Sequence, residues 1–176
     1  MSRLRRLVAC ERGYTLIELL QVMVILGVVM TGLGVVFVQA SNAELDMNRR
    51  FQAQQEARVA VDKMRREIHC SKAITPAGNA TAVTVTIPSQ CPSSGGSEID
   101  VVYDTLEIGS GRFQLRRAGV RIADYVRIGN VFTYTAPSST RLGTLRVDLP
   151  INIQPPGSGS NWNLVADIVL RNTARG

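Results

Sequence analysis

The residues from Leu19 to Val38 form a run of 20 that contains no charged side chain and only two polar ones, Gln21 and Thr31. In an α-helix with a rise of about 1.5 Å per residue, such a run is about 30 Å long, which matches the hydrocarbon core of a bilayer. The sequence therefore predicts a membrane-spanning helix in this part of the chain.

Positive charge precedes the apolar run. Within residues 1–13, Arg3, Arg5, Arg6 and Arg12 occur with a single acidic residue, Glu11, and these five residues contribute half of the net charge of +6. Basic residues beside a first apolar segment hold that flank in the cytoplasm. We therefore expect everything after the span to lie outside the cytoplasm, and we interpret the basic cluster as a topology signal.

The order of features differs from that of a secretory signal peptide, in which a small-residue cleavage site follows an apolar core of about 7 to 15 residues. Here the run is longer, no Ala-x-Ala site follows it, and the small residue Gly13 precedes it. The span should therefore survive processing. A simple signal anchor, with Glu18 reaching the headgroups, is the alternative.

The stretch from Gly13 to Leu20, Gly-Tyr-Thr-Leu-Ile-Glu-Leu-Leu, closely resembles the N-terminal motif of prepilins and pseudopilins. The resemblance implies that a prepilin peptidase cuts after Gly13 and N-methylates the new amine of Tyr14. The usual first residue is phenylalanine or methionine, so Tyr14 is a departure that keeps a large aromatic ring. The family's glutamate falls on Glu18.

A carboxylate such as that of Glu18, at the edge of an apolar span, costs about 2.5 kcal/mol or more without a partner. In the family, the partner is the N-terminal amine of a neighbouring subunit, and the pair sets the axial register during assembly. The resemblance thus assigns Glu18 to filament assembly.

The resemblance also implies a domain organisation and a set of partners. Residues 1–13 are a leader that is removed, 14–38 a transmembrane and filament-core helix, 39–70 its amphipathic extension, and 71–176 an extracytoplasmic head. The implied role is that of a minor pilin or minor pseudopilin in a type IV pilus or type II secretion pseudopilus. The implied partners are other pilin or pseudopilin subunits, the prepilin peptidase, an inner-membrane assembly platform and the membrane, with no cofactor.

Helical character continues beyond the span, because Ala40 to Ile68 contains neither proline nor glycine. One helix from about Thr15 to Ile68 is expected. Apolar residues at a spacing of three and four predict a stripe that packs on the head: Ala53, Ala57, Ala60, Val61, Met64 and Ile68. Charged residues on the other faces, Glu67 among them, are expected to be solvated, while Met47 and Phe51 are assigned to subunit contacts.

The head is expected to be a mostly antiparallel β-sheet, which makes the fold class α+β. Thr75 to Asn79 is interpreted as the exit from the helix. Alternating apolar residues and turn signals predict strands at 81–87, 99–103, 112–117, 126–134, 144–153 and 164–170.

Cys70 and Cys91 form an even pair in the part expected to be exported, whereas Cys10 lies in the leader. A disulfide between them closes a loop of about 22 residues and contributes about 3 kcal/mol in the chain-entropy model. Free buried thiols are one alternative. A metal site that includes His69 is another, although a fourth ligand at recognisable spacing is lacking.

The sequence offers no catalytic set. His69 is the only histidine and is expected to be an exposed residue at the helix end. Ser158 lies between glycines in a proline- and serine-rich loop rather than in a strand-to-helix elbow. No phosphate-binding glycine loop is present, so we expect a building block rather than an enzyme.

A cluster of arginines in the head suggests an alternative function. On strands, these side chains could form one basic face that contacts DNA phosphates, as a DNA-uptake pilin would require, or they could serve solubility beside nearby acidic residues. The cluster consists of Arg112, Arg116, Arg117, Arg121 and Arg127.

Overall fold

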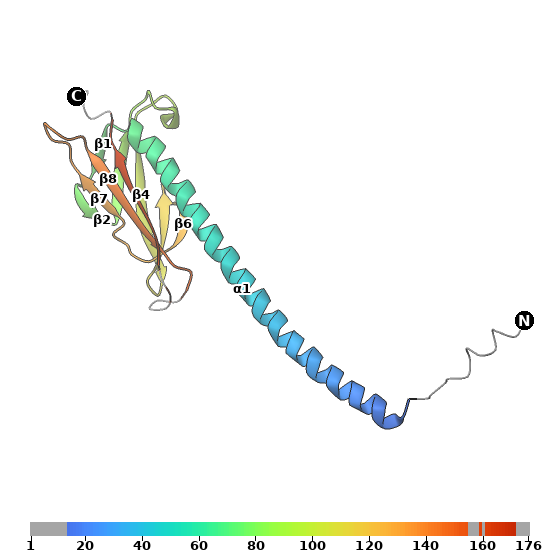
Figure 1. Ribbon diagram of the computed structural model, residues 1–176. Helices are drawn as coiled ribbons and strands as arrows, with labels where there is room; N and C mark the ends of the chain where they lie inside the picture. The colour runs from blue at the N-terminus through green and yellow to red at the C-terminus, as the bar shows by residue number, and fades with distance from the viewer. Residues whose placement is uncertain (1–13, 155–158, 160, 172–176) are drawn as a thin grey trace, which may run out of the picture. The chain divides into compact units, whose positions relative to one another are not determined.

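The computed structural model describes residues 14–154, 159 and 161–171, and it contains one long helix followed by a β-sheet (Figure 1). The chain forms two compact units, Met1–Asp46 and Met47–Gly176, which are described separately. The helix α1 (Leu16–Cys70) contributes to both. The α+β class and the long helix expected from the sequence are thus confirmed.

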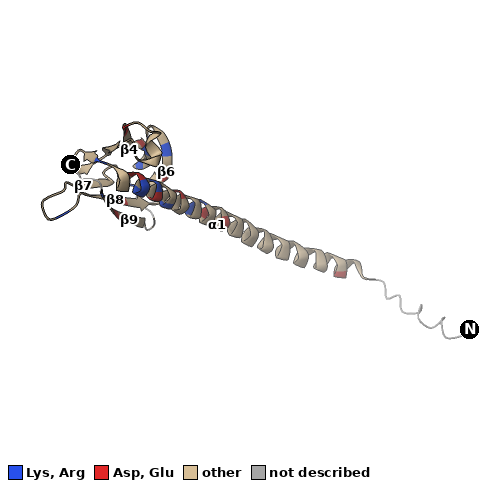
Figure 2. Cartoon of the chain, turned by 90° about the horizontal axis from the view of Figure 1, so that it is seen from above, with Lys and Arg blue, Asp and Glu red and all other residues tan. Residues whose placement is uncertain are grey.

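In the first unit, α1 begins with a side-chain cap. Thr15 Oγ1 accepts a hydrogen bond from the backbone N–H of Glu18 at 3.3 Å, and the Thr15 carbonyl accepts from Glu18 and Leu19 at 3.0 and 3.2 Å. A threonine at this position satisfies N–H groups that have no partner within a helix. The helix then runs unbroken through Gly27, and its first half is almost free of charge (Figure 2).

In the second unit, one face of α1 packs on the sheet. The six residues of the predicted stripe are all buried, with exposed fractions of 3% or less. Three of them are alanines, whose small side chains let the helix backbone approach the strands closely. The stripe is confirmed.

Glu67 was expected to be solvated, and this prediction was wrong. It lies among the buried residues of α1 with 4% exposure. Tyr103 Oη donates to Glu67 Oε2 at 2.5 Å, and Arg117 Nε lies 3.0 and 3.1 Å from the two carboxylate oxygens. Burial, and then the hydrogen bond to Glu67, raise the pKa of Tyr103 well above its ordinary value. A buried carboxylate is tolerated here because it is both paired and hydrogen-bonded.

Nine strands occur in the described part of the chain: β1 (Ala73–Thr75), β2 (Gly78–Ala80), β3 (Ala82–Ile87), β4 (Ile99–Gly109), β5 (Arg112–Arg117), β6 (Val120–Val126), β7 (Phe132–Thr135), β8 (Thr144–Ile151) and β9 (Trp162–Val169). The order in the sheet is β1-β3-β4-β5-β6-β8-β7-β2, with β9 also pairing β8. Every pairing is antiparallel. Because β1 and β2 are consecutive in the chain but lie at the two ends of this order, the sheet is curled.

Two parts of the strand prediction were wrong. The expected strand at 126–134 joins the end of β6 to most of β7: Val126 pairs with Ile151, Phe132 pairs with Val147, and residues 127–131 connect the two strands. Residues 120–125 of β6 were not predicted as a strand. The expected helix exit at 75–79 includes parts of β1 and β2, whose three residues each are too few to show an alternating pattern. Both errors arise because pairing partners, not local sequence, define these strands.

Replacing Glu67 with alanine should lower the free energy of unfolding of the head by about 3 kcal/mol, because Arg117 would lose its partner in a largely buried position. The measurement is denaturant unfolding of the detergent-solubilised chain, followed by circular dichroism. The matched control is Asp62→Ala, which removes an exposed ion pair with Arg65 on the same helix and should cost less than about 0.5 kcal/mol. Equal effects of the two substitutions would contradict the role of Glu67.

Candidate functional site

The candidate site is the start of α1. Gly13 lies outside the described residues. Tyr14 precedes the helix and is 81% exposed, Thr15 caps the first turn, and Glu18 is an exposed residue of that turn. Within residues 14–154, 159 and 161–171, the Glu18 carboxylate has neither a hydrogen bond nor an ion pair. Its position in the first turn favours a negative charge, since the N-terminal end of a helix is partially positive.

The apolar run that follows Glu18 is uncovered within the chain. Large apolar side chains from Leu16 to Val38 are 50–84% exposed. Together they form a continuous apolar surface of a size that soluble monomers rarely display. The helix contains an 18-residue window with a mean hydropathy of 2.4 and is, by length and composition, able to cross a membrane. This surface requires lipid or other helices around it.

The same segment matches a known family model. Residues 9–34 match the model described as the prokaryotic N-terminal methylation motif. The match supports a type IV pilin-like protein. Comparisons with curated proteins and with solved structures found no match. The N-terminal motif together with the apolar helix supports a membrane-anchored pilin-like chain that assembles with other pilin subunits.

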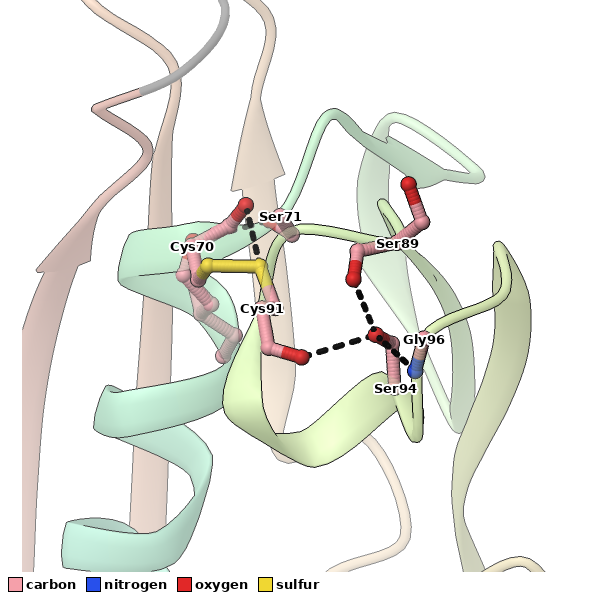
Figure 3. The surroundings of a disulfide bond; sticks show 7 residues. Cys70, Ser71, Ser89, Cys91, Ser94 and Gly96 are labelled. Atoms are coloured by element: carbon pink, nitrogen blue, oxygen red, sulfur yellow. Dashed lines mark hydrogen bonds between the residues drawn. A yellow bond between two sulfur atoms is a disulfide. The ribbon is translucent and has the colours of Figure 1, made fainter.

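A disulfide joins the last residue of α1 to the loop before β4 (Figure 3). Cys70 and Cys91 are 21 residues apart in sequence, and their Cα atoms are separated by 6.0 Å, which lies in the usual range for a disulfide. The loop continues into the short 3-10 helix η2 (Pro92–Ser94), where the buried Ser94 hydroxyl lies 2.7 and 3.0 Å from the carbonyls of Cys91 and Ser89. The disulfide fixes the loop to the end of the helix, and the Ser94 contacts hold the turn within the loop itself.

His69 is half-buried, not exposed as expected from its place at the helix end. Its Nδ1 lies 2.8 Å from the carbonyl oxygen of Val169, so the ring donates an N–H to β9. No group of three histidine, cysteine, aspartate or glutamate residues within the described part of the chain could hold a metal ion. His69 thus links the last turn of α1 to the sheet.

The arginine cluster is largely engaged with carboxylates. Arg112 donates to Asp124 through Nε at 3.0 Å and Nη2 at 2.6 Å. Arg116 pairs with Asp104, Arg117 with Glu67, and Arg121 with Asp124 at 3.3 Å. Neighbouring residues of a strand point to opposite faces, which separates Arg116 from Arg117.

Asp104 and Asp124 are among the nearby acidic residues that were expected to balance the arginines, with Asp100 and Glu107, whereas Glu67 was not expected as a partner. Except for Arg121 and Asp124, which both lie in β6, each pair joins two different elements. The pattern of arginines therefore suggested a free basic surface that the pairings largely neutralise. DNA contact through the five arginines stays a prediction from the sequence, and these contacts do not favour it. The arrangement of Arg112, Gln114 and Arg121 around Asp124, called the Asp124 group below, was not predicted, because Arg112 and Gln114 reach Asp124 only through the pairing of β5 with β6.

We predict that Cys70 and Cys91 are oxidised in the protein isolated from membranes and that reduction lowers the stability of the head by about 3 kcal/mol. Alkylation of the purified chain before and after reduction, read by mass spectrometry, tests the bond. Unfolding with and without reductant tests its contribution. The Cys70→Ser/Cys91→Ser variant is the control, since its stability should not respond to reductant. Full alkylation without prior reduction would contradict the prediction.

Proposed function

We propose that this chain is a structural subunit of a filament, a minor pilin or minor pseudopilin of a type IV pilus or a type II secretion pseudopilus, and contributes to its assembly or priming. The single observation that carries the proposal is the methylation motif on an unbroken helix whose apolar residues are uncovered. In this role, residues 14–38 are surrounded by lipid before assembly and by neighbouring helices afterwards. The role is structural rather than catalytic.

Processing is the first step of the proposal. A prepilin peptidase removes residues 1–13 by cutting after Gly13 and methylates the amine of Tyr14. The positive flank keeps the leader in the cytoplasm, so the head of residues 71–176 lies on the other side of the membrane. An inner-membrane assembly platform then brings the subunit to the growing filament.

The second step of the proposal is the alignment of the incoming subunit in the filament, and Glu18 takes part in it. Its carboxylate finds no partner within the described residues, and an apolar surrounding makes an unpaired carboxylate costly. The N-terminal amine of a neighbouring subunit is a cation at a matching depth in the membrane. Pairing the two charges favours one axial position of the incoming subunit over others, which sets the register.

Further contacts between subunits are proposed on the helix beyond the span. Met47 and Phe51 are 71% and 65% exposed, although both are large and apolar. They lie on α1 away from the buried stripe, so the head does not cover them. In a filament, neighbouring helices would bury them and gain the transfer free energy of both side chains.

The mature protein should begin with an N-methylated tyrosine at position 14. Mass spectrometry of the N-terminal peptide from membranes of a host with the prepilin peptidase measures this directly. Replacing Gly13 with a bulky residue should leave the leader attached, because the small residue before the cut is lost. Gly27→Ala, which adds a methyl group in open space on the span, is the control and should be processed normally. An uncut wild-type chain would instead favour a simple signal anchor.

Replacing Glu18 with alanine should leave membrane insertion and cleavage intact but reduce incorporation into filaments by about tenfold, in keeping with the loss of one charge-assisted pair. Incorporation is measured by immunoblotting sheared filaments against total membrane protein. Glu44→Ala changes another exposed glutamate of the same helix and should incorporate normally. Normal incorporation of the Glu18 variant would rule out its register role.

A further inference from the structure

A cavity of about 260 Å³ lies beside the Asp124 group, within the second unit. Three arginines line it: Arg49 from α1, Arg112 from β5 and Arg121 from β6. Gln52, Glu56 and Tyr125 contribute to the same wall. With Glu56 and Asp124 as the two acidic residues, the lining carries one net positive charge.

The sheet side of the cavity is built on an irregular backbone. Phe113 pairs with Val126 and Leu115 with Ala123, so Asp124 and Tyr125 together lie opposite the single residue Gln114, which is a β-bulge. Tyr125 has a φ of 61°, in the left-handed region that costs an aromatic residue backbone strain. Strain of this kind persists where surrounding contacts hold it, and it is concentrated at functional sites.

The bulge has a direct consequence for Arg112. Adjacent residues of a regular strand point to opposite faces, but here both Asp124 and Tyr125 reach the same guanidinium group. Asp124 accepts two hydrogen bonds from it, and the guanidinium carbon lies 3.9 Å from the centre of the Tyr125 ring. Arg112 is thereby held in one orientation although 36% of its side chain is exposed.

Asp124 itself is saturated. One carboxylate oxygen accepts from Arg112 Nε and the Tyr125 N–H, and the other accepts from Arg112, Gln114 and Arg121. Burial alone would raise the pKa of Asp124, but the hydrogen bonds from Arg112 and Tyr125 hold that pKa below its ordinary value. The carboxylate therefore stays charged, and its role is to orient the two arginines.

Arg49 is the remaining cation of the lining. It is exposed, and within the described ranges it makes no hydrogen bond or ion pair. The cavity thus combines two oriented guanidinium groups with a third that has no partner in this part of the chain. The Nε and Nη2 donors of Arg112 are taken by Asp124, whereas Arg49 and the Nε–Nη2 edge of Arg121 have no hydrogen-bond acceptor in the described residues. A guanidinium edge of this kind recognises a planar anion through paired N–H donors.

We propose that this cavity binds a single carboxylate group, of the kind carried by an acidic side chain of a partner protein. The net charge of the lining matches a monovalent anion, and the volume lies below that of pockets for larger ligands. A polyanion such as DNA requires a row of cations along its backbone, whereas Glu56 and Asp124 interrupt the positive charge here. The inference goes beyond the filament role and does not depend on it.

The test is a titration of the full-length chain in detergent micelles with N-acetyl-glutamate amide, followed by NMR of ¹⁵N-labelled arginine side chains. The Nε–H signals of Arg112 and Arg121 should shift with saturation. N-acetyl-glutamine amide has the same shape without the charge and should cause no saturable shift. Arg49→Gln should weaken the binding about fivefold. This change corresponds to the upper limit of what one exposed ion pair usually contributes.

The matched control is Arg66→Gln, which removes an exposed cation of the same helix that does not line the cavity. Its affinity for the probe should equal that of the unmodified chain, and circular dichroism verifies that both variants fold. The proposal is overturned by the absence of a saturable shift, by an equal response to the glutamine probe, or by equal effects of the two substitutions. Tighter binding of inorganic phosphate than of the glutamate probe would also overturn it, in favour of a phosphate site.

Discussion

The buried carboxylate of Glu67 is the polar contact on which the position of the helix in the head depends. It projects from α1 into the interface with the sheet and meets Tyr103 of β4 and Arg117 of β5. An apolar stripe alone would tolerate small rotations and shifts of the helix, since dispersion and burial are not directional. A buried charge does not, because any movement that separates it from its donors leaves it unsatisfied.

The same end of the helix is held at two further points. His69 reaches the carbonyl of Val169 in β9, and Cys70 is bonded to Cys91 in the loop before β4. The last turn of α1 is therefore fixed to strands at different places in the sheet order and to a loop. In the proposed filament role such an attachment is needed, because the helix that would pack in the filament also carries the head.

Much of this arrangement could be predicted from the sequence, and the errors have a common cause. The span, the stripe from Ala53 to Ile68 and the alternating strand β3 follow from periods of 3.6 and 2 that are local properties. Glu67 was misplaced because its neighbours in sequence are charged and exposed, whereas its partner Arg117 is 50 residues away. The bulge at Asp124 and Tyr125 likewise cannot be recognised from the local sequence, since a bulge is defined by the residues that it faces on the opposite strand.

The sequence by itself determined the apolar span, the glutamate at its edge, the processing motif and the face that the helix presents to the head, because each depends on residues within a few turns of one another. Only the tertiary structure decided which arginines are neutralised, which cation lacks a partner in the described residues, and how Asp124 orients two guanidinium groups. Apart from the Arg121–Asp124 pair within β6, those properties depend on distances between side chains on different elements. Such distances arise from register and curvature of the sheet, which the whole chain sets together.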